Sequence, residues 1–237
     1  RRICLITRRW SDRVLASYYL RRFHSEIAVS VRGKDCFVLG SGPSPNISLF
    51  DPEMVVVSVN GSYANGKMLG LPQPVLTVVD YELLDPSVNI GKETRRVVVE
   101  ERLLKGLHLG ALVAVQSNSS RGGSPSSLQA TYDRFLQIRK EHRRAIVHHV
   151  TGANLLENHV RGLTSTGAFC VALCAYGGAR SVTFAGFSLF KSVHDEVEPH
   201  YYLEKGLDFR VSGNPQDIEM LGNEELDSRN HSLADCC

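Results

Sequence analysis

Apolar residues recur along the chain in runs of strand length, separated by gaps long enough for helices. The runs are continuously apolar and rich in β-branched residues, as is typical of parallel strands that are covered on both faces. They are Cys36–Leu39, Met54–Val59, Pro74–Val79, Ala111–Val115, Ala145–Val150 and Val182–Phe187. This alternation predicts an α/β fold with a Rossmann-like open, mostly parallel sheet and helices on both faces.

Three helices are indicated between and before these runs. Residues 8–23 place Trp10, Val14 and Tyr18 on one face at helical spacing. A second predicted helix begins at Ser124-Pro125, with proline at its first position, and runs to about residue 144. A third runs from Ser165 to about Tyr176 and stops at Gly177-Gly178.

The predicted organisation is an N-terminal basic amphipathic helix over residues 1–30 and a single globular domain over residues 31–237. Residues 190–230 are rich in charge, glycine and asparagine, which predicts a lid-like insertion over the site. Because the sequence begins at Arg1 and not at methionine, we expect it to be a fragment of a longer protein.

Composition narrows the class only slightly. The chain has 237 residues, 43% of them hydrophobic, and a formal net charge of +2, which suits one globular domain and gives no reason to expect a nucleic-acid partner. Arginines are frequent near the start of the chain, on the predicted helix that carries Trp10, Val14 and Tyr18. This pattern predicts either peripheral contact with an anionic membrane, or an ordinary helix whose apolar face packs on the core and whose charged face is solvated. No apolar run reaches the roughly eighteen residues that a membrane span needs. The six cysteines include no CxxC pair, and most lie in apolar runs as reduced core residues.

The candidate chemistry lies after the predicted strands, where open α/β sheets bind ligands. The first strand is followed by a turn that suits a phosphate or ribose, because glycines let the ligand approach and exposed N–H groups favour anions. Its residues are Gly40, Ser41, Gly42, Pro43 and Ser44. A tight structural turn explains the same residues. A dinucleotide fingerprint is disfavoured, because Pro45 stands where it has a third glycine and Asn60 where it has an acid.

Two further strand and helix ends carry polar groups. Asp80 and Glu82 follow the third strand, where two carboxylates would either hold Mg²⁺ or Mn²⁺ or simply cap the loop. Ser165, Thr166 and Gly167 begin the third helix, where free N–H groups suit a phosphate or carboxylate, or where Ser165 acts only as a helix cap.

Four short segments of the chain resemble motifs of sialyltransferases, and most closely those of the bacterial lipooligosaccharide sialyltransferases. Ser-Thr-Gly, an apolar helix, glycine and "SVTFAGF" resemble the short sialyl motif, and "FVLGSGPS" with Asn60 resembles the start of the nucleotide site. His200-Tyr201-Tyr202 resembles the aromatic third motif, and Asn230-His231-Ser232 the segment with the catalytic histidine. The resemblance spans about residues 35–235 and implies a GT-A-like variant of the Rossmann fold.

The resemblance implies an inverting transfer of sialic acid, or a related ulosonic acid, from a CMP-sugar to a glycan or glycolipid hydroxyl. His231 would be the general base, and no metal or other cofactor would be needed. His200, Tyr201 and Tyr202 would bind the leaving phosphate, while the Gly40–Ser44 turn, Asn60, Asp80 and the Ser165–Gly167 segment would bind the donor. A helix is expected to begin near His231 and to keep its imidazole neutral. The implied location is cytoplasmic, peripheral on the inner membrane face.

Two alternatives remain at this point. The first is a transferase for CMP-Kdo, or one that uses a metal-dependent nucleotide-sugar donor through Asp80 and Glu82. The second is a domain of the same fold that binds a nucleotide or glycan without catalysis, because fold does not determine function.

Overall fold

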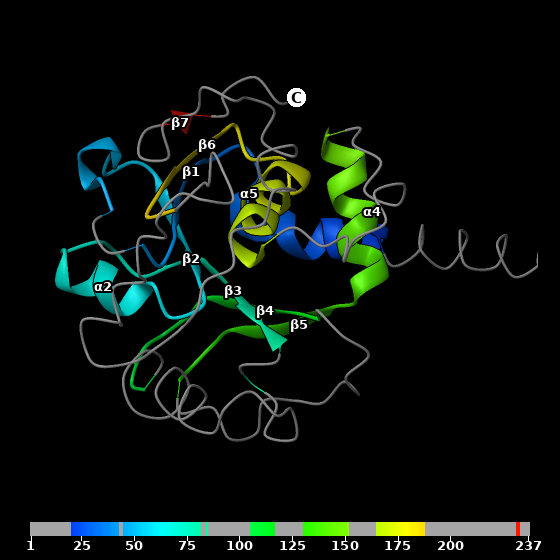
Figure 1. Cartoon of the computed structure of the whole chain (residues 1–237), viewed down its shortest axis with the longest axis horizontal. Coiled ribbons are helices and arrows are strands. Elements are labelled where there is room, and N and C mark those ends of the chain that lie inside the picture. The colour runs from blue at the N-terminus through cyan, green and yellow to red at the C-terminus, as the bar shows by residue number, and fades with distance from the viewer. Residues whose placement is uncertain are drawn as a thin grey trace, which may run out of the picture.

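A computed structural model describes residues 20–42, 45–81, 84, 105–116, 130–151, 165–187 and 231–232. Within these ranges the chain forms one sheet in the order β5-β4-β3-β2-β1-β6-β7 (Figure 1). The strands are β1 (Asp35–Leu39), β2 (Val55–Val59), β3 (Leu76–Asp80), β4 (Ala111–Val115), β5 (Arg134–Ile138), β6 (Ser181–Ala185) and β7 (His231–Ser232). Strands β1 to β6 pair in parallel, and β7 pairs with β6 antiparallel.

The order of the strands creates a topological switch point between β1 and β6. From β1 the chain adds β2, β3, β4 and β5 in one direction, and then returns to place β6 on the opposite side of β1. All five residues of β4 are buried, as are four of the five in β1, β2, β3 and β6, because helices cover both faces. The predicted Rossmann-like α/β fold is confirmed.

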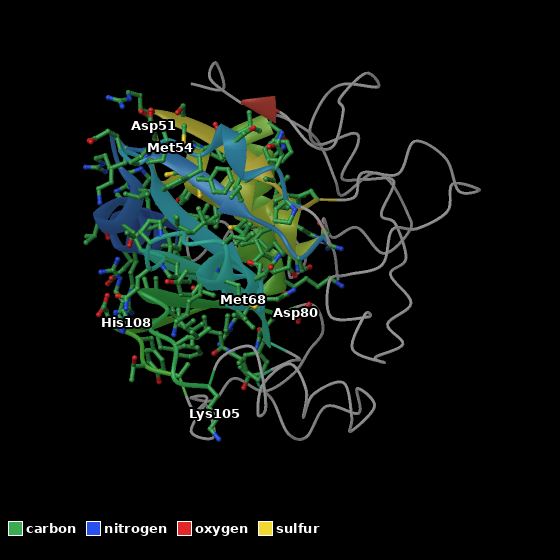
Figure 2. The ribbon with its side chains drawn as sticks, turned by 90° about the vertical axis from the view of Figure 1, so that its left-hand side faces the viewer. Asp51, Met54, Met68, Asp80, Lys105 and His108 are labelled. Carbon is green, nitrogen blue, oxygen red and sulfur yellow. The ribbon has the colours of Figure 1, made fainter. Side chains whose placement is uncertain are left out.

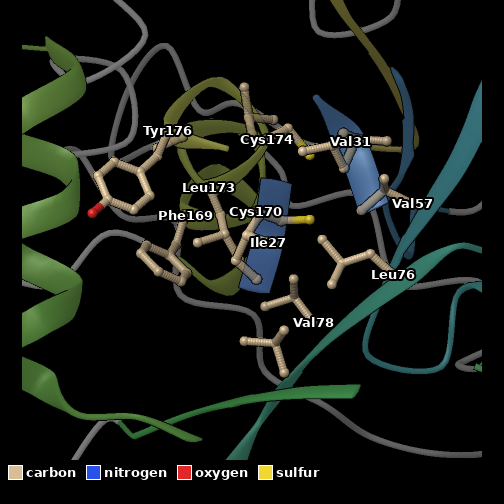
Figure 3. Packing of buried hydrophobic residues seen from close by; sticks show 14 of the residues in the cluster. Ile27, Val31, Val57, Leu76, Val78, Phe169, Cys170, Leu173, Cys174 and Tyr176 are labelled. Carbon is tan, nitrogen blue, oxygen red and sulfur yellow. The ribbon is translucent and has the colours of Figure 1, made fainter. Parts of the chain in front are cut away.

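One face of the sheet is covered by helical residues 20–31 and by α4 (Lys140–Thr151) and α5 (Thr166–Tyr176). Helix α5 is apolar almost all round, as a helix enclosed by the core must be. Figure 3 shows Cys170 and Cys174 on its side toward Val31 and Val57, and Phe169 and Tyr176 on its side toward α4. The predicted start and stop are also confirmed: Ser165 is the N-cap and Gly177 the C-cap.

The other face carries the short helix η1 (Ile47–Leu49) and α2 (Tyr63–Met68), on the opposite side of the sheet from α5 in Figure 1. Gly66 lets α2 lie close to β1, because a β-carbon there would be 2.7 Å from Cδ2 of Leu39. Two buried hydroxyls beneath this layer, Ser58 Oγ and Thr77 Oγ1, are hydrogen-bonded at 2.7 Å. Thr77 Oγ1 donates onward to the Leu109 carbonyl at 2.9 Å, so neither hydroxyl is left unsatisfied.

The helix over residues 20–31 belongs to the core of the sheet domain. It continues across the predicted boundary between residues 30 and 31 and buries Phe23 and Ile27 against the main cluster. The guanidinium of Arg134 donates to the Glu26 carbonyl at 3.0 Å and to Ser30 Oγ at 2.7 Å, which ties the helix to β5. Trp10, Val14 and Tyr18, the proposed membrane stripe, lie outside the described residues.

The structure corrects two predicted elements. The run at 145–150 is part of helix α4 and not a strand, because its buried residues, from His142 to Val147, fall at helical spacing. The helix predicted over 124–144 contains β5 at Arg134–Ile138 instead, and helix begins only at Lys140. The lid predicted over 190–230 lies outside the described residues.

Three thiols lie side by side in the main core. Cys36, Cys170 and Cys174 are free and buried, as the sequence predicts for reduced core cysteines, whereas the other three lie outside the described residues. A hydrogen bond with Cys174, together with burial, raises the pKa of the Cys36 thiol. Because thiolate is the reactive form, Cys36 should be unreactive toward oxidants and alkylating agents while the core is folded.

Within the described ranges, every helix is too short or too polar to cross a membrane.

The packing of His142 on α4 predicts a loss of stability in mild acid. Its side chain is buried, its ring lies 5.3 Å from that of Phe23, and burial lowers its pKa. The unfolded chain, with a histidine pKa of about 6.5, therefore binds the proton more readily, so the free energy of unfolding falls as the pH drops below that value. We expect His142→Phe to flatten this fall between pH 7.5 and 5.5 in urea titrations.

The exposed His148 on the same helix provides the control, and His148→Phe should leave the pH dependence unchanged. Equal pH dependence in the wild type and in His142→Phe would contradict a buried neutral imidazole.

Candidate functional site

The site is best sought at the carboxyl ends of β1 and β6, where the strand order reverses. Three segments meet there: residues 40–42 after β1, residues 186–187 after β6, and the first turn of α5. The N-terminus of α5 lies at this end of the sheet, as the packing of Gly167 on Phe187 shows. The other end of α5 lies at the opposite end of the strands, where the Arg180 N–H donates to the carbonyl of Lys34, just before β1.

The two glycines after β1 are bonded to the end of β6. The Gly40 N–H donates to the Ala185 carbonyl at 2.8 Å, and the Gly42 N–H donates to the Gly186 carbonyl at 2.7 Å. The expectation that these N–H groups are exposed and attract a phosphate is therefore wrong for these two residues, because both donors are already used. The turn instead joins the two strands that flank the switch point.

Glycine is required here by the close approach of two backbones. A β-carbon at position 40 would lie 2.3 Å from the Gly186 carbonyl oxygen, and one at position 42 would lie 2.8 Å from the same atom. Gly186 itself has a φ of 76°, a left-handed conformation that disfavours other residues. The structural explanation of the glycines is thus sufficient, and what remains for a ligand is the surface that the packed turn presents.

The first turn of α5 has backbone N–H groups that remain available to a ligand. Ser165 Oγ accepts from the Ala168 N–H at 3.1 Å, which confirms its capping role. Among the described residues, the N–H groups of Thr166 and Gly167 have no hydrogen-bond partner, as is usual at a helix start. Both residues are half-buried. Of the predicted donor-binding segments, this one offers backbone donors with the positive end of a helix behind them.

Asn60 links the carboxyl ends of β2 and β3. It adopts a φ of 52°, which asparagine tolerates better than most residues, and its Oδ1 accepts from the Asp80 N–H at 3.0 Å. Its carboxamide nitrogen has no partner within the described part of the chain and so can donate to a ligand. Figure 2 shows Asp80 at the edge of the sheet opposite Met54 and His108, which precede β2 and β4.

Two residues at this edge were missed by the sequence analysis. Ser62 is fully buried, donates to the Leu39 carbonyl at 2.6 Å and accepts from the Val59 N–H at 3.0 Å, so it joins the ends of β1 and β2. Phe187 packs against both Gly40 and Gly167. The glycines in "FVLGSGPS" and "STG" suggest close packing, but only the fold shows that one ring packs against both Gly40 and Gly167.

His231 lies in strand β7, next to the end of β6. Its register partner is Phe184, and that of Ser232 is Thr183. The expected helix start at His231 is therefore wrong, and a helix dipole at that residue gives no reason for a neutral imidazole. The strand places the backbone of His231 one residue from Ala185, whose carbonyl binds Gly40.

Several predicted site residues lie outside the described ranges, namely Pro43, Ser44, Glu82, His200, Tyr201 and Tyr202. Within those ranges, no group of three or more histidine, cysteine, aspartate or glutamate side chains is arranged to hold a metal ion. The described edge thus brings together Gly40, Ser41, Gly42, Thr166 and Gly167 around the switch point, with Asn60 and Asp80 on the neighbouring strands.

No protein-family model, curated protein or solved structure matches the chain. Its function therefore has to be inferred from the chemistry of this edge.

The backbone contact at Gly40 predicts that Gly40→Ala strongly destabilises the fold. The added methyl group would overlap the Gly186 carbonyl, and because that atom belongs to the backbone it cannot turn away. We expect a loss of about 3 kcal/mol or more in the free energy of unfolding, at the upper end of the cost of overpacking. Urea denaturation followed by circular dichroism measures this.

Gly106→Ala is the control, because nothing lies within 4 Å of a β-carbon there. Its φ of 69° leaves only the smaller cost of a left-handed alanine, about 1–2 kcal/mol. Similar losses in the two variants would refute the close approach.

Proposed function

We propose that this protein is a glycosyltransferase of the sialyltransferase type, which transfers sialic acid or a related ulosonic acid from a CMP-sugar to a glycan hydroxyl. One observation carries the proposal: β7 pairs with β6 so that His231 stands beside Phe184, at the end of the sheet where Gly40 binds Ala185. The candidate base and the candidate nucleotide turn are far apart in sequence, yet the strands that carry them, β7 and β1, lie on either side of β6.

The available donors suit a ligand with an anionic group and a neutral hydrogen-bond acceptor. The N–H groups of Thr166 and Gly167, at the positive end of α5, would bind the phosphate or the carboxylate of the donor. The carboxamide nitrogen of Asn60 would donate to the ribose or to an acceptor atom of the base. The Gly40–Gly42 turn contributes the surface between them and not its own N–H groups.

The proposed reaction is a direct displacement. The acceptor oxygen attacks the anomeric carbon as the bond from that carbon to the phosphate oxygen breaks, and the electron pair of that bond leaves on CMP. His231 takes the proton of the acceptor hydroxyl, a task for which a histidine titrating near neutral pH is suited. His200, Tyr201 and Tyr202 would donate hydrogen bonds to the phosphate as its negative charge grows. The anomeric configuration is inverted.

This mechanism predicts different effects for two histidine variants. We expect His231→Ala to lower kcat for transfer from CMP-sialic acid to a sialic-acid acceptor glycan by about 10²- to 10⁴-fold, the usual contribution of a general base. Affinity for CMP should stay nearly unchanged, because the base contacts the acceptor and not the nucleotide. His200→Ala should slow turnover and also weaken CMP binding, because it removes a donor to the phosphate.

His108→Ala is the matched control, since His108 lies at the opposite edge of the sheet (Figure 2). Steady-state assays and CMP titrations of the full chain give both quantities. Near-normal turnover in His231→Ala would contradict the proposed base. Loss of activity with EDTA would favour the metal-dependent alternative, and CMP binding without any donor cleavage would favour a non-catalytic nucleotide-binding domain.

A further inference from the structure

The ring of Phe187 is held between two glycines from distant parts of the chain. A β-carbon at position 167 would lie 2.4 Å from its Cε1, and one at position 40 would lie 2.9 Å from its Cδ2. These two atoms are at opposite corners of the ring, so each glycine lies against a different part of it. The ring also stands edge-on to Phe184, with centroids 5.4 Å apart, and is partly buried against the main core.

We propose that Phe187 is a positioning residue of the site. Its ring sets the distance between the Gly40–Gly42 turn and the first turn of α5, the two elements on either side of the switch point. The importance of this distance for ligand binding rests on the proposed function, in which the CMP-sugar contacts both elements. Phe187 has no polar side-chain atom and acts only through the backbones that it separates.

The geometry favours this role over simple core filling. A core side chain usually packs against other side chains, whereas this ring occupies the space that two missing β-carbons leave beside backbone. A planar ring held at two opposite corners and by Phe184 has few alternative positions. A smaller, flexible side chain would let the turn and the helix move toward each other, and binding groups tolerate displacements of only about 0.5 Å.

A double-mutant cycle tests the packing without any ligand. In the wild type, Gly167→Ala should lower the melting temperature by several degrees, because the new methyl group overlaps the ring. In a Phe187→Leu background the same change should be neutral or stabilising, because alanine is the better helix former once the ring is gone. Equal changes in both backgrounds would overturn the proposal.

Affinity for CMP, measured by calorimetry, tests the consequence. Phe187→Leu should weaken CMP binding on the order of tenfold, a modest case of the losses that misplaced binding groups cause. Phe37→Leu, in the cluster on the other face of β1, should lose comparable stability and keep wild-type affinity. If Phe187→Leu folds too poorly, Phe187→Met replaces it in both experiments.

The two experiments separate two kinds of failure. A wild type that binds no CMP would contradict the proposed function, while the stability cycle would still decide whether the ring separates the two elements. A wild type that binds CMP, with unchanged affinity in Phe187→Leu, would overturn the positioning role alone.

Discussion

The rest of the structure depends on the close contact between the backbones that follow β1 and β6. Gly40 and Gly42 donate to the carbonyls of Ala185 and Gly186 at distances that leave no room for a β-carbon. This contact continues the parallel pairing of β1 with β6 beyond the two strands, and β7 pairs with the other side of β6. The two backbones can meet this closely at the switch point because these residues are glycines.

Much of the fold could be predicted because local signals and the tertiary structure agree. Continuous apolar runs mark the buried parallel strands, and α5 is bounded by the expected serine cap and glycine stop. The prediction failed where the local sequence signals and the tertiary structure disagree. Arg134–Ile138 carries arginine and glutamine within a strand, while the helical run Ala145–Val150 has three β-branched residues, as many as a strand of this length. The guanidinium of Arg134 donates to the Glu26 carbonyl in the helix over residues 20–31. That partner is more than a hundred residues away in the sequence, so no local pattern reveals the contact.

The sequence indicates which residues lie at the candidate site, but not which of their N–H groups are available to a ligand. The sequence indicates glycines, hydroxyls and an asparagine at strand and helix ends, and the structure does bring Gly40, Asn60 and Thr166 to one edge. Sequence cannot tell which N–H groups are used within the fold, because that depends on the register of β1 against β6. Among the described residues, the N–H groups of Thr166 and Gly167 at the start of α5 are left for an anion, and the Asn60 carboxamide lies at the end of β2. Phe187 was missed because its two glycine partners are distant in sequence.

Hydrogen–deuterium exchange of the full chain, with and without CMP, tests the location of the nucleotide most directly. The amides of Thr166 and Gly167 have no partner among the described residues and should exchange quickly in the free protein. A ligand at the switch point predicts that CMP slows exchange in peptides covering residues 165–167 and 60–62, and leaves residues 105–110 at the opposite edge unchanged. Protection confined to the opposite edge, or none at residues 165–167 at saturating CMP, would contradict the account.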